Sequence, residues 1–117
     1  MSEGGISRDL IRGNIDTIIL RVLSEGDNYG YEIIKEIFKS SSGNYELKET
    51  SLYSSLKRLQ VQKLIEAYWG DESQGGRRKY YKITELGVET FEKNLKAWRT
   101  AKVLIDQLIE VRGDENE

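Results

Sequence analysis

The sequence predicts a mostly α-helical protein with one small β-hairpin, in the order three helices, hairpin and long final helix. Apolar residues recur at helical spacing through most of the 117 residues. Two short runs rich in strand-forming residues, 64–69 and 79–83, flank a glycine-containing loop, which is typical of a hairpin. The chain has no proline, so nothing of that kind interrupts the helical patterns.

Composition indicates one ordinary globular domain with a modest core. Hydrophobic residues make up 38% of the chain and charged residues 32%. No apolar run approaches the roughly 18 residues of a membrane span, and the N-terminus MSEGGISRDL has no signal-peptide pattern, so we expect a cytoplasmic protein without membrane contact. The chain has neither Cys nor His, which excludes thiolate nucleophiles, imidazole bases and the usual zinc sites. We therefore expect no enzyme, no metal site and no cofactor.

Residues 7–24 predict the first helix, with Ser7 as its N-cap and one apolar stripe along it. A second helix is expected to begin near Tyr29 and Gly30, and the polar residues 40–44 form a loop. Thr50 is a suitable N-cap for a third helix, in which Leu52, Leu56 and Leu59 face inward. The side chains predicted to point outward from this helix are Ser51, Ser54, Ser55, Lys57 and Arg58.

The hairpin and the last helix complete the chain. Residues 64–69 and 79–83 are the predicted strands, with 71–76 as their loop. Thr84 opens the last helix, Gly87 weakens its first turn, and the pattern continues to about Val111. A helix of that length reaches about 37 Å, which exceeds what a small domain covers, so its apolar face predicts a second copy of the chain as partner. We divide the chain into a domain at 7–84, a dimerisation helix at 85–112, and flexible termini at 1–6 and 113–117.

Charge is unevenly distributed along the chain. The net charge is -2, yet residues 35–82 hold ten Lys and Arg against six acidic residues, and residues 106–117 hold five acidic residues against Arg112. A basic middle with an acidic end allows one face to meet phosphate groups. Gly75 and Gly76 permit close approach to a ligand, and Arg77, Arg78 and Lys79 follow directly. Because side chains alternate along a strand, Arg77 and Lys79 share one face while Arg78 lies on the other.

Three helices followed by a hairpin is the order of a winged helix-turn-helix, a DNA-binding arrangement. The third helix is slim and rich in short hydroxyl side chains, which suits the major groove, and basic residues beside a wing tip suit the sugar-phosphate backbone. A merely solvated helix face and a solubilising turn are the alternatives. Trp69 ends the first strand, and we expect it to pack under the hairpin.

Three segments resemble the PadR family of bacterial transcription regulators: DNYGYEIIK at 27–35, ETSLYSSLKRL at 49–59 and GGRRKYYKITELG at 75–87. The resemblance implies a winged-helix dimer, in most members a repressor of a palindromic operator. Ser51-Leu52-Tyr53 corresponds to the family's Thr-Leu-Tyr at the start of the recognition helix, which implies that Tyr53 contacts the DNA backbone. The expected DNA-binding residues are Lys35, Thr50, Ser51, Tyr53, Ser54, Lys57, Arg58, Gly75, Gly76, Arg77, Arg78 and Lys79.

The single long C-terminal helix resembles a short subgroup that includes multidrug-sensing repressors. That resemblance places Trp98 at a pore on the dimer axis, where a planar aromatic or cationic drug-like molecule would stack. Helix phase and the subgroup pattern give the expected lining: Leu10, Gly13, Asp16, Thr17, Leu95, Trp98, Ala101, Lys102 and Ile105. Asp16 would attract cations and Lys102 would oppose them. Trp98 as a plain apolar anchor of the dimer is the alternative.

The sequence therefore predicts a dimeric, sequence-specific DNA-binding repressor that binds a double-stranded operator. We expect a planar aromatic ligand to relieve repression. The alternative function is a winged-helix protein-interaction module that binds neither DNA nor a small molecule.

Overall fold

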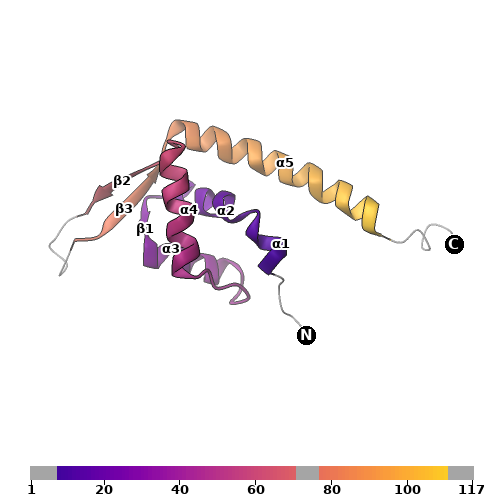
Figure 1. The fold of residues 1–117 in the computed structure, drawn as a ribbon, viewed down its shortest axis with the longest axis horizontal. Coiled ribbons are helices and arrows are strands. Elements are labelled where there is room, and N and C mark those ends of the chain that lie inside the picture. Colours follow the sequence, from indigo (N-terminus) through magenta and orange to yellow (C-terminus); the bar gives the residue numbers. More distant parts are fainter. Residues whose placement is uncertain (1–7, 71–76, 111–117) are drawn as a thin grey trace.

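The computed structural model describes residues 8–70 and 77–110 (Figure 1). The proposed N-cap Ser7, the loop glycines Gly75 and Gly76 and both predicted flexible termini lie outside the described residues. The last helix ends at Ile109, two residues before the predicted end near Val111. The helices are α1 (Arg8–Arg12), α2 (Ile15–Ser24), α3 (Gly30–Ser40), α4 (Glu49–Val61) and α5 (Glu85–Ile109). The strands are β1 (Asn28–Tyr29), β2 (Ile65–Trp69) and β3 (Lys79–Ile83). The predicted class, mostly α with a small β-hairpin, is confirmed.

The first predicted helix is in fact two, because the chain breaks between α1 and α2 at Gly13 and Asn14. The Asn14 N–H donates to the Ile11 carbonyl at 2.7 Å, and the Asn14 carbonyl accepts from Ile18 at 2.9 Å. Glycine is the poorest helix former after proline, and the asparagine beside it also favours caps over helix interiors. The apolar periodicity runs through the break, which is why it suggested one continuous helix.

The sheet has three strands, one more than the sequence predicted. β1 pairs antiparallel with β3, and β3 pairs antiparallel with β2, giving the order β1-β3-β2. β1 contains two residues, Asn28 opposite Tyr81 and Tyr29 opposite Tyr80. Such a short strand has no alternation to detect, since a period of two needs several residues to show. The β2–β3 hairpin has the predicted strands, except that β2 begins one residue later than predicted, at Ile65.

The core lies between α2, α3, α4 and one face of the sheet. Its least exposed apolar side chains, all at 1% or less, are Ile19, Leu20, Leu23, Ile33, Leu52, Leu56 and Leu59. Ile65 of β2 and Tyr81 of β3 extend this cluster onto the sheet. The three inward positions predicted for the third helix are confirmed. The prediction that Ser55 points outward is wrong, because its exposure is only 2%.

The two predicted helix caps that lie within the described residues differ in outcome. Thr84 caps α5, and its hydroxyl accepts a hydrogen bond from the Gly87 N–H at 3.0 Å. Thr50 is not a cap, because α4 begins one residue earlier at Glu49 with Lys48 in the cap position and no side-chain cap bond. Thr50 therefore lies in the first turn, where its side chain is free to face outward. No side chain among the described residues satisfies the first backbone N–H groups of α4, so these donors remain available to other acceptors.

Gly87 does more than weaken the first turn of α5. A Cβ atom at this position would collide with the Leu64 carbonyl oxygen and would lie 2.6 Å from the Ile83 side chain. The glycine is buried and lets α5 start directly against the base of the hairpin. It therefore sets the direction in which α5 leaves the domain.

α5 runs past the domain and leaves its second half uncovered (Figure 1). Val103, Leu104, Ile105, Leu108 and Ile109 are all exposed, Leu108 at 75% and Ile109 at 72%. This agrees with the prediction that the helix is longer than its own domain. No helix in the described residues is long and apolar enough to cross a membrane.

Candidate nucleic-acid interface

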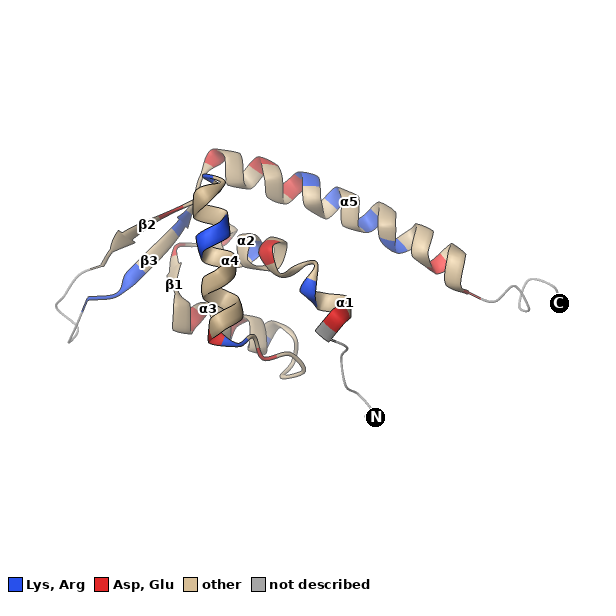
Figure 2. Cartoon of the chain, in the orientation of Figure 1, with Lys and Arg blue, Asp and Glu red and all other residues tan. Residues whose placement is uncertain are grey.

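The outer face of α4 presents hydroxyl and basic side chains. Figure 2 shows basic residues on α4 and along β3 beside the hairpin loop. Ser51 is half-buried, and the exposed predicted contacts on this helix are Thr50, Tyr53, Ser54, Lys57 and Arg58. The face arises because the buried leucines of α4 recur at helical spacing and leave the intervening positions to solvent. Hydroxyl groups can donate to and accept from base edges, and lysine can neutralise a phosphate.

Arg58 is held against α2. Its Nε donates to Asp16 Oδ2 at 2.8 Å, and its Nη2 donates to Asp16 Oδ1 at 2.7 Å and to Ser55 Oγ at 3.0 Å. Burial alone would raise the pKa of Asp16, but hydrogen bonds from Arg58 and Ser55 and the Arg58 charge together lower it below its ordinary value. A guanidinium that already binds a carboxylate through two of its nitrogens has few N–H donors left to contact a DNA base. The geometry therefore makes Arg58 an anchor of α4 on α2.

Tyr53 lies over the start of α3. A Cβ on Gly30 would collide with the Tyr53 hydroxyl, so the glycine provides the space that this ring occupies. The Tyr53 side chain is nevertheless 49% exposed, which leaves its outer edge available. On α3, Lys35 is exposed, pairs with Glu32 at 3.5 Å, and has its Nζ 5.5 Å from the centre of the Tyr31 ring.

A polar hollow of about 420 Å³ lies beside the first turns of α4, and the sequence did not single out all of its residues. Its lining includes Thr50, Ser51 and Ser54, and besides Arg58 it has two further basic residues, Arg12 of α1 and Lys48 before α4. Arg12 forms an exposed pair with Asp9 at 2.9 Å. Lys48 is one of the ten basic residues counted between positions 35 and 82. The sequence did not place it at the N-terminal end of α4, because the helix was predicted to begin after Thr50 and in fact begins at Glu49.

The three basic residues beside the hairpin loop are exposed, and each lies near an aromatic ring. The centre of the Arg77 guanidinium is 4.8 Å from the Trp69 ring centre, and that of Arg78 is 4.7 Å from the Tyr29 ring centre. Lys79 Nζ is 6.0 Å from the Trp69 ring centre. The expectation that Trp69 packs under the hairpin is wrong, because its side chain is 55% exposed. The cause is its position beyond the end of the core, where β2 projects into solvent.

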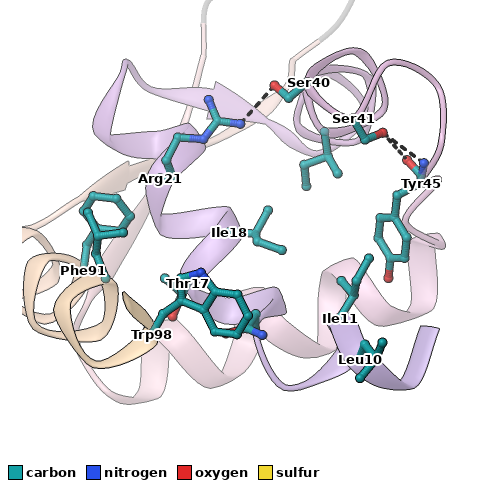
Figure 3. Close-up of a pocket in the computed structure, with 13 residues that line it drawn as sticks. Leu10, Ile11, Thr17, Ile18, Arg21, Ser40, Ser41, Tyr45, Phe91 and Trp98 are labelled. Carbon is teal, nitrogen blue, oxygen red and sulfur yellow. Dashed lines mark hydrogen bonds between the residues drawn. The ribbon is translucent and has the colours of Figure 1, made fainter. Parts of the chain in front are cut away.

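An apolar hollow of about 550 Å³ lies between α1, α2, the end of α3 and α5 (Figure 3). Four of the predicted ligand residues line it: Leu10, Thr17, Leu95 and Trp98. Figure 3 shows Trp98 and Phe91 from α5 on one side and Ser41 and Tyr45 across the opening. Trp98 is 43% exposed. Among the described lining residues Arg21 alone carries a charge, and it is paired with Glu25 at 2.8 Å and donates to Ser40 at 3.1 Å.

The other five predicted ligand residues do not line this hollow in one copy of the chain. They are Gly13, Asp16, Ala101, Lys102 and Ile105. Asp16 points to Arg58 on the other side of α2, which removes the predicted attraction for a cation. Gly13 lies in the break between α1 and α2, so its expected helical phase does not apply. Lys102 and Ile105 are exposed on the uncovered half of α5.

Several residues of the apolar hollow could not be identified from the sequence. Ile18, Ile37 and Phe91 line it, and helical spacing alone does not distinguish a lining position from a core position. Arg21 and Tyr45 also line it, and no local pattern distinguishes them. In the part of the chain that the structure describes, no group of three His, Cys, Asp or Glu is placed to hold a metal ion.

Comparison with known proteins adds sequence and structural relatives. A sequence model of the Transcriptional regulator PadR-like family matches residues 19–93. The chain is 45% identical to a protein of Lysinibacillus sphaericus over 90% of this chain and 96% of that protein. It is 35% identical to the transcriptional regulator YqjI of Escherichia coli over 86% of this chain, and spans 44% of YqjI. A transcriptional regulator from Clostridium thermocellum has a similar structure, with a TM-score of 0.82 and 43% identity over 90% of this chain and 99% of that one.

Proposed function

Because the chain belongs to the PadR-like family of transcriptional regulators, we propose that it is a dimeric, sequence-specific DNA-binding repressor. The same membership places it among regulators and not among enzymes, as the sequence predicted. The observation that carries the proposal is the outer face of α4, where hydroxyl groups and Lys57 are exposed, together with the exposed basic residues beside the hairpin loop. In a winged helix-turn-helix this helix enters the major groove and the hairpin follows the backbone.

DNA binding by the α4 face is tested with a labelled fragment from upstream of the protein's own gene and a scrambled fragment of equal length. The wild-type chain is expected to bind the upstream fragment more tightly. Lys57→Ala is expected to weaken binding to both fragments and to make the dependence of log K on log salt less steep by about 0.9 for each phosphate that it no longer neutralises. Lys96→Ala, which removes an exposed lysine of α5, is the matched control and is expected to bind as the wild type does.

Equal affinity of the wild-type chain for the two fragments would contradict sequence-specific recognition. No binding to either fragment at physiological salt would overturn the DNA-binding proposal and favour a protein-interaction module. Wild-type affinity and salt dependence in Lys57→Ala would leave DNA binding standing but remove Lys57 from the interface.

The dimer is supported by the uncovered half of α5. Its exposed apolar side chains are Val103, Leu104, Ile105, Leu108 and Ile109. Leu104, Ile105, Leu108 and Ile109 lie at helical spacing on one side of α5, and an exposed apolar stripe of this kind marks an interaction surface. Leu10 on α1 is also 77% exposed. A second copy presents the same surfaces in a two-fold arrangement, which buries both at once. Two copies of α4 would then reach successive major grooves about 34 Å apart.

Relief by a small molecule is supported by the apolar hollow beside Trp98. An indole at its edge can stack on a planar ring. No carboxylate is present among the described lining residues, which favours an uncharged planar aromatic ligand over a cationic one. A planar dye is expected to quench tryptophan fluorescence in Trp69→Phe, where Trp98 alone reports, and not in Trp98→Ala. Equal quenching in both variants would overturn stacking on Trp98.

A further inference from the structure

The two faces of the β2–β3 hairpin carry different aromatic groups. The cross-strand pairs Ile65–Ile83, Ala67–Tyr81 and Trp69–Lys79 share one face, because side chains alternate along each strand. The pair Tyr68–Tyr80 lies on the other face. Along the first face the exposure rises from 2% at Ile65 to 55% at Trp69. This face therefore leaves the core and continues into solvent toward the hairpin loop.

The face with Trp69 is the one that α4 covers. Ile65 and Tyr81 on this face belong to the same buried cluster as Leu52 and Leu56 of α4. α4 also packs against β2. Burial, and then the neighbouring Tyr53 on α4, raise the pKa of Tyr81. Trp69 thus projects on the side of the sheet from which α4 presents its hydroxyl and basic groups.

Two cations share the Trp69 ring on that side. Arg77 lies 4.8 Å and Lys79 6.0 Å from the ring centre. The face of an indole attracts a cation and restricts the rotamers of a long side chain. Arginine and lysine side chains lose considerable conformational freedom when they bind, so a cation that is already ordered contributes more of its attraction to affinity.

Arg78 lies on the opposite face and belongs to a tyrosine cluster. Its guanidinium is 4.7 Å from the Tyr29 ring centre. Tyr29 meets Tyr80 edge to face at 5.4 Å, and Tyr80 stacks on Tyr68 at 5.7 Å. This cluster joins the short strand β1 to the hairpin, so the contacts of Arg78 are explained by the sheet itself.

We propose that Trp69 is a positioning residue of the DNA interface, whose indole holds Arg77 and Lys79 toward the duplex that α4 contacts. Arg78, on the far face, serves the tyrosine cluster and does not contact that duplex. This assignment rests on the proposed DNA-binding function. Strand alternation already placed Arg78 on a different face from Arg77 and Lys79, and the contacts with the aromatic rings give the two faces different roles.

The affinity of the upstream DNA fragment, measured by fluorescence anisotropy over a range of salt concentrations, tests this division. Arg77→Ala and Lys79→Ala are each expected to flatten the log–log salt dependence by about 0.9 per phosphate left without its cation, while Arg78→Ala retains the wild-type slope and affinity. Trp69→Leu is expected to weaken binding about five- to tenfold, and Trp69→Phe, which keeps a ring, restores most of the affinity. A slope in Arg78→Ala as flat as in Arg77→Ala, or wild-type affinity in Trp69→Leu, would overturn the proposal.

Fluorescence separates positioning from a structural effect. In a Trp98→Phe background Trp69 is the only tryptophan of the chain, and its emission is expected to change when the upstream fragment is added. The change is expected to diminish when Arg77→Ala is added to that background. Emission unaffected by saturating DNA would contradict a place for Trp69 in the interface. Absence of specific DNA binding by the wild-type chain would instead overturn the proposed function, so the two failures are distinguishable.

Discussion

Asp16 and Arg58 join α2 to α4 through a two-pronged ion pair, with side-chain exposures of 30% for Asp16 and 51% for Arg58. Asp16→Asn keeps the shape and removes the charge, and we expect it to lower the free energy of unfolding at pH 7 by about 1 kcal/mol. Because the pKa of Asp16 is lowered in the folded chain, the stabilisation is present above its ordinary value of 3.8 and is lost as pH falls through the folded value. Urea unfolding from pH 7 into the acid range measures this.

The pair between Asp9 and Arg12 provides the control for that experiment. Its side chains are 80% and 72% exposed, so Asp9→Asn is expected to change stability far less. A deficit in Asp16→Asn that persists unchanged well below pH 3.8 would contradict an origin in the Asp16 charge. The deficit should instead shrink toward zero there, since both chains then carry a neutral group at position 16.

Gly87 is a second residue whose role depends on close contact. Gly87→Ala forces a methyl group against the Leu64 carbonyl oxygen and the Ile83 side chain, and we expect it to destabilise the fold by about 1–3 kcal/mol. Gly13→Ala is the matched control, because a Cβ there meets nothing within 4 Å and the backbone has no positive φ. Thermal unfolding of both variants tests this. An equal effect of the two substitutions would show that backbone entropy, and not the contact with Leu64, dominates.

At the scale of elements, the uncovered half of α5 makes the dimer testable. Leu108→Glu places a charge on the exposed apolar face at a position that is 75% exposed in one copy, so the fold of a single chain should not suffer. We expect sedimentation velocity to show monomers and the affinity for the upstream fragment to fall, since one α4 then binds without its partner. Gln107→Glu adds the same charge to the exposed position beside it and is expected to remain dimeric. A dimeric Leu108→Glu would place the interface elsewhere.

Elements with a long repeated pattern could be predicted, and short or interrupted ones could not. The inward leucines of α4, the two hairpin strands and the Thr84 cap of α5 follow from local spacing and chemistry, and the structure has them. β1 is defined only by its pairing with β3, across more than 50 residues of sequence. The break at Gly13 and Asn14 was hidden because the apolar positions on both sides remain in register.

The candidate site was predictable only as far as single elements determine it. Helical phase indicated the outward face of α4, with the exception of Ser55, which is buried and accepts a hydrogen bond from Arg58. The partner of Asp16 was not predictable, because Arg58 lies 42 residues away in sequence. The segregation of Arg77 and Lys79 from Arg78 followed from strand alternation, but the rings beneath them depend on strand register.

At the scale of the whole molecule, α2 lies between the two proposed sites. Adjacent residues of its first turn face opposite neighbours: Asp16 holds Arg58 of α4, and the Thr17 hydroxyl accepts a hydrogen bond from Asn94 of α5 at 3.0 Å. Thr17 and Ile18 also line the apolar hollow. A ligand there lies against the helix that anchors α4. It can lower DNA affinity only if it binds the two arrangements of these helices unequally.

This arrangement predicts that Asn94 transmits the effect of a ligand and does not bind it. Asn94 does not line the hollow, so Asn94→Ala is expected to keep the affinity for a planar aromatic dye that does not itself bind DNA. It should reduce the factor by which the dye weakens DNA binding, because the tie between α5 and α2 is gone. Anisotropy titrations of the upstream fragment with and without dye give that factor, and Lys93→Ala on the exposed side of α5 is the control. An undiminished factor in Asn94→Ala would exclude this hydrogen bond as the link, whereas weaker dye binding would make Asn94 part of the ligand site instead.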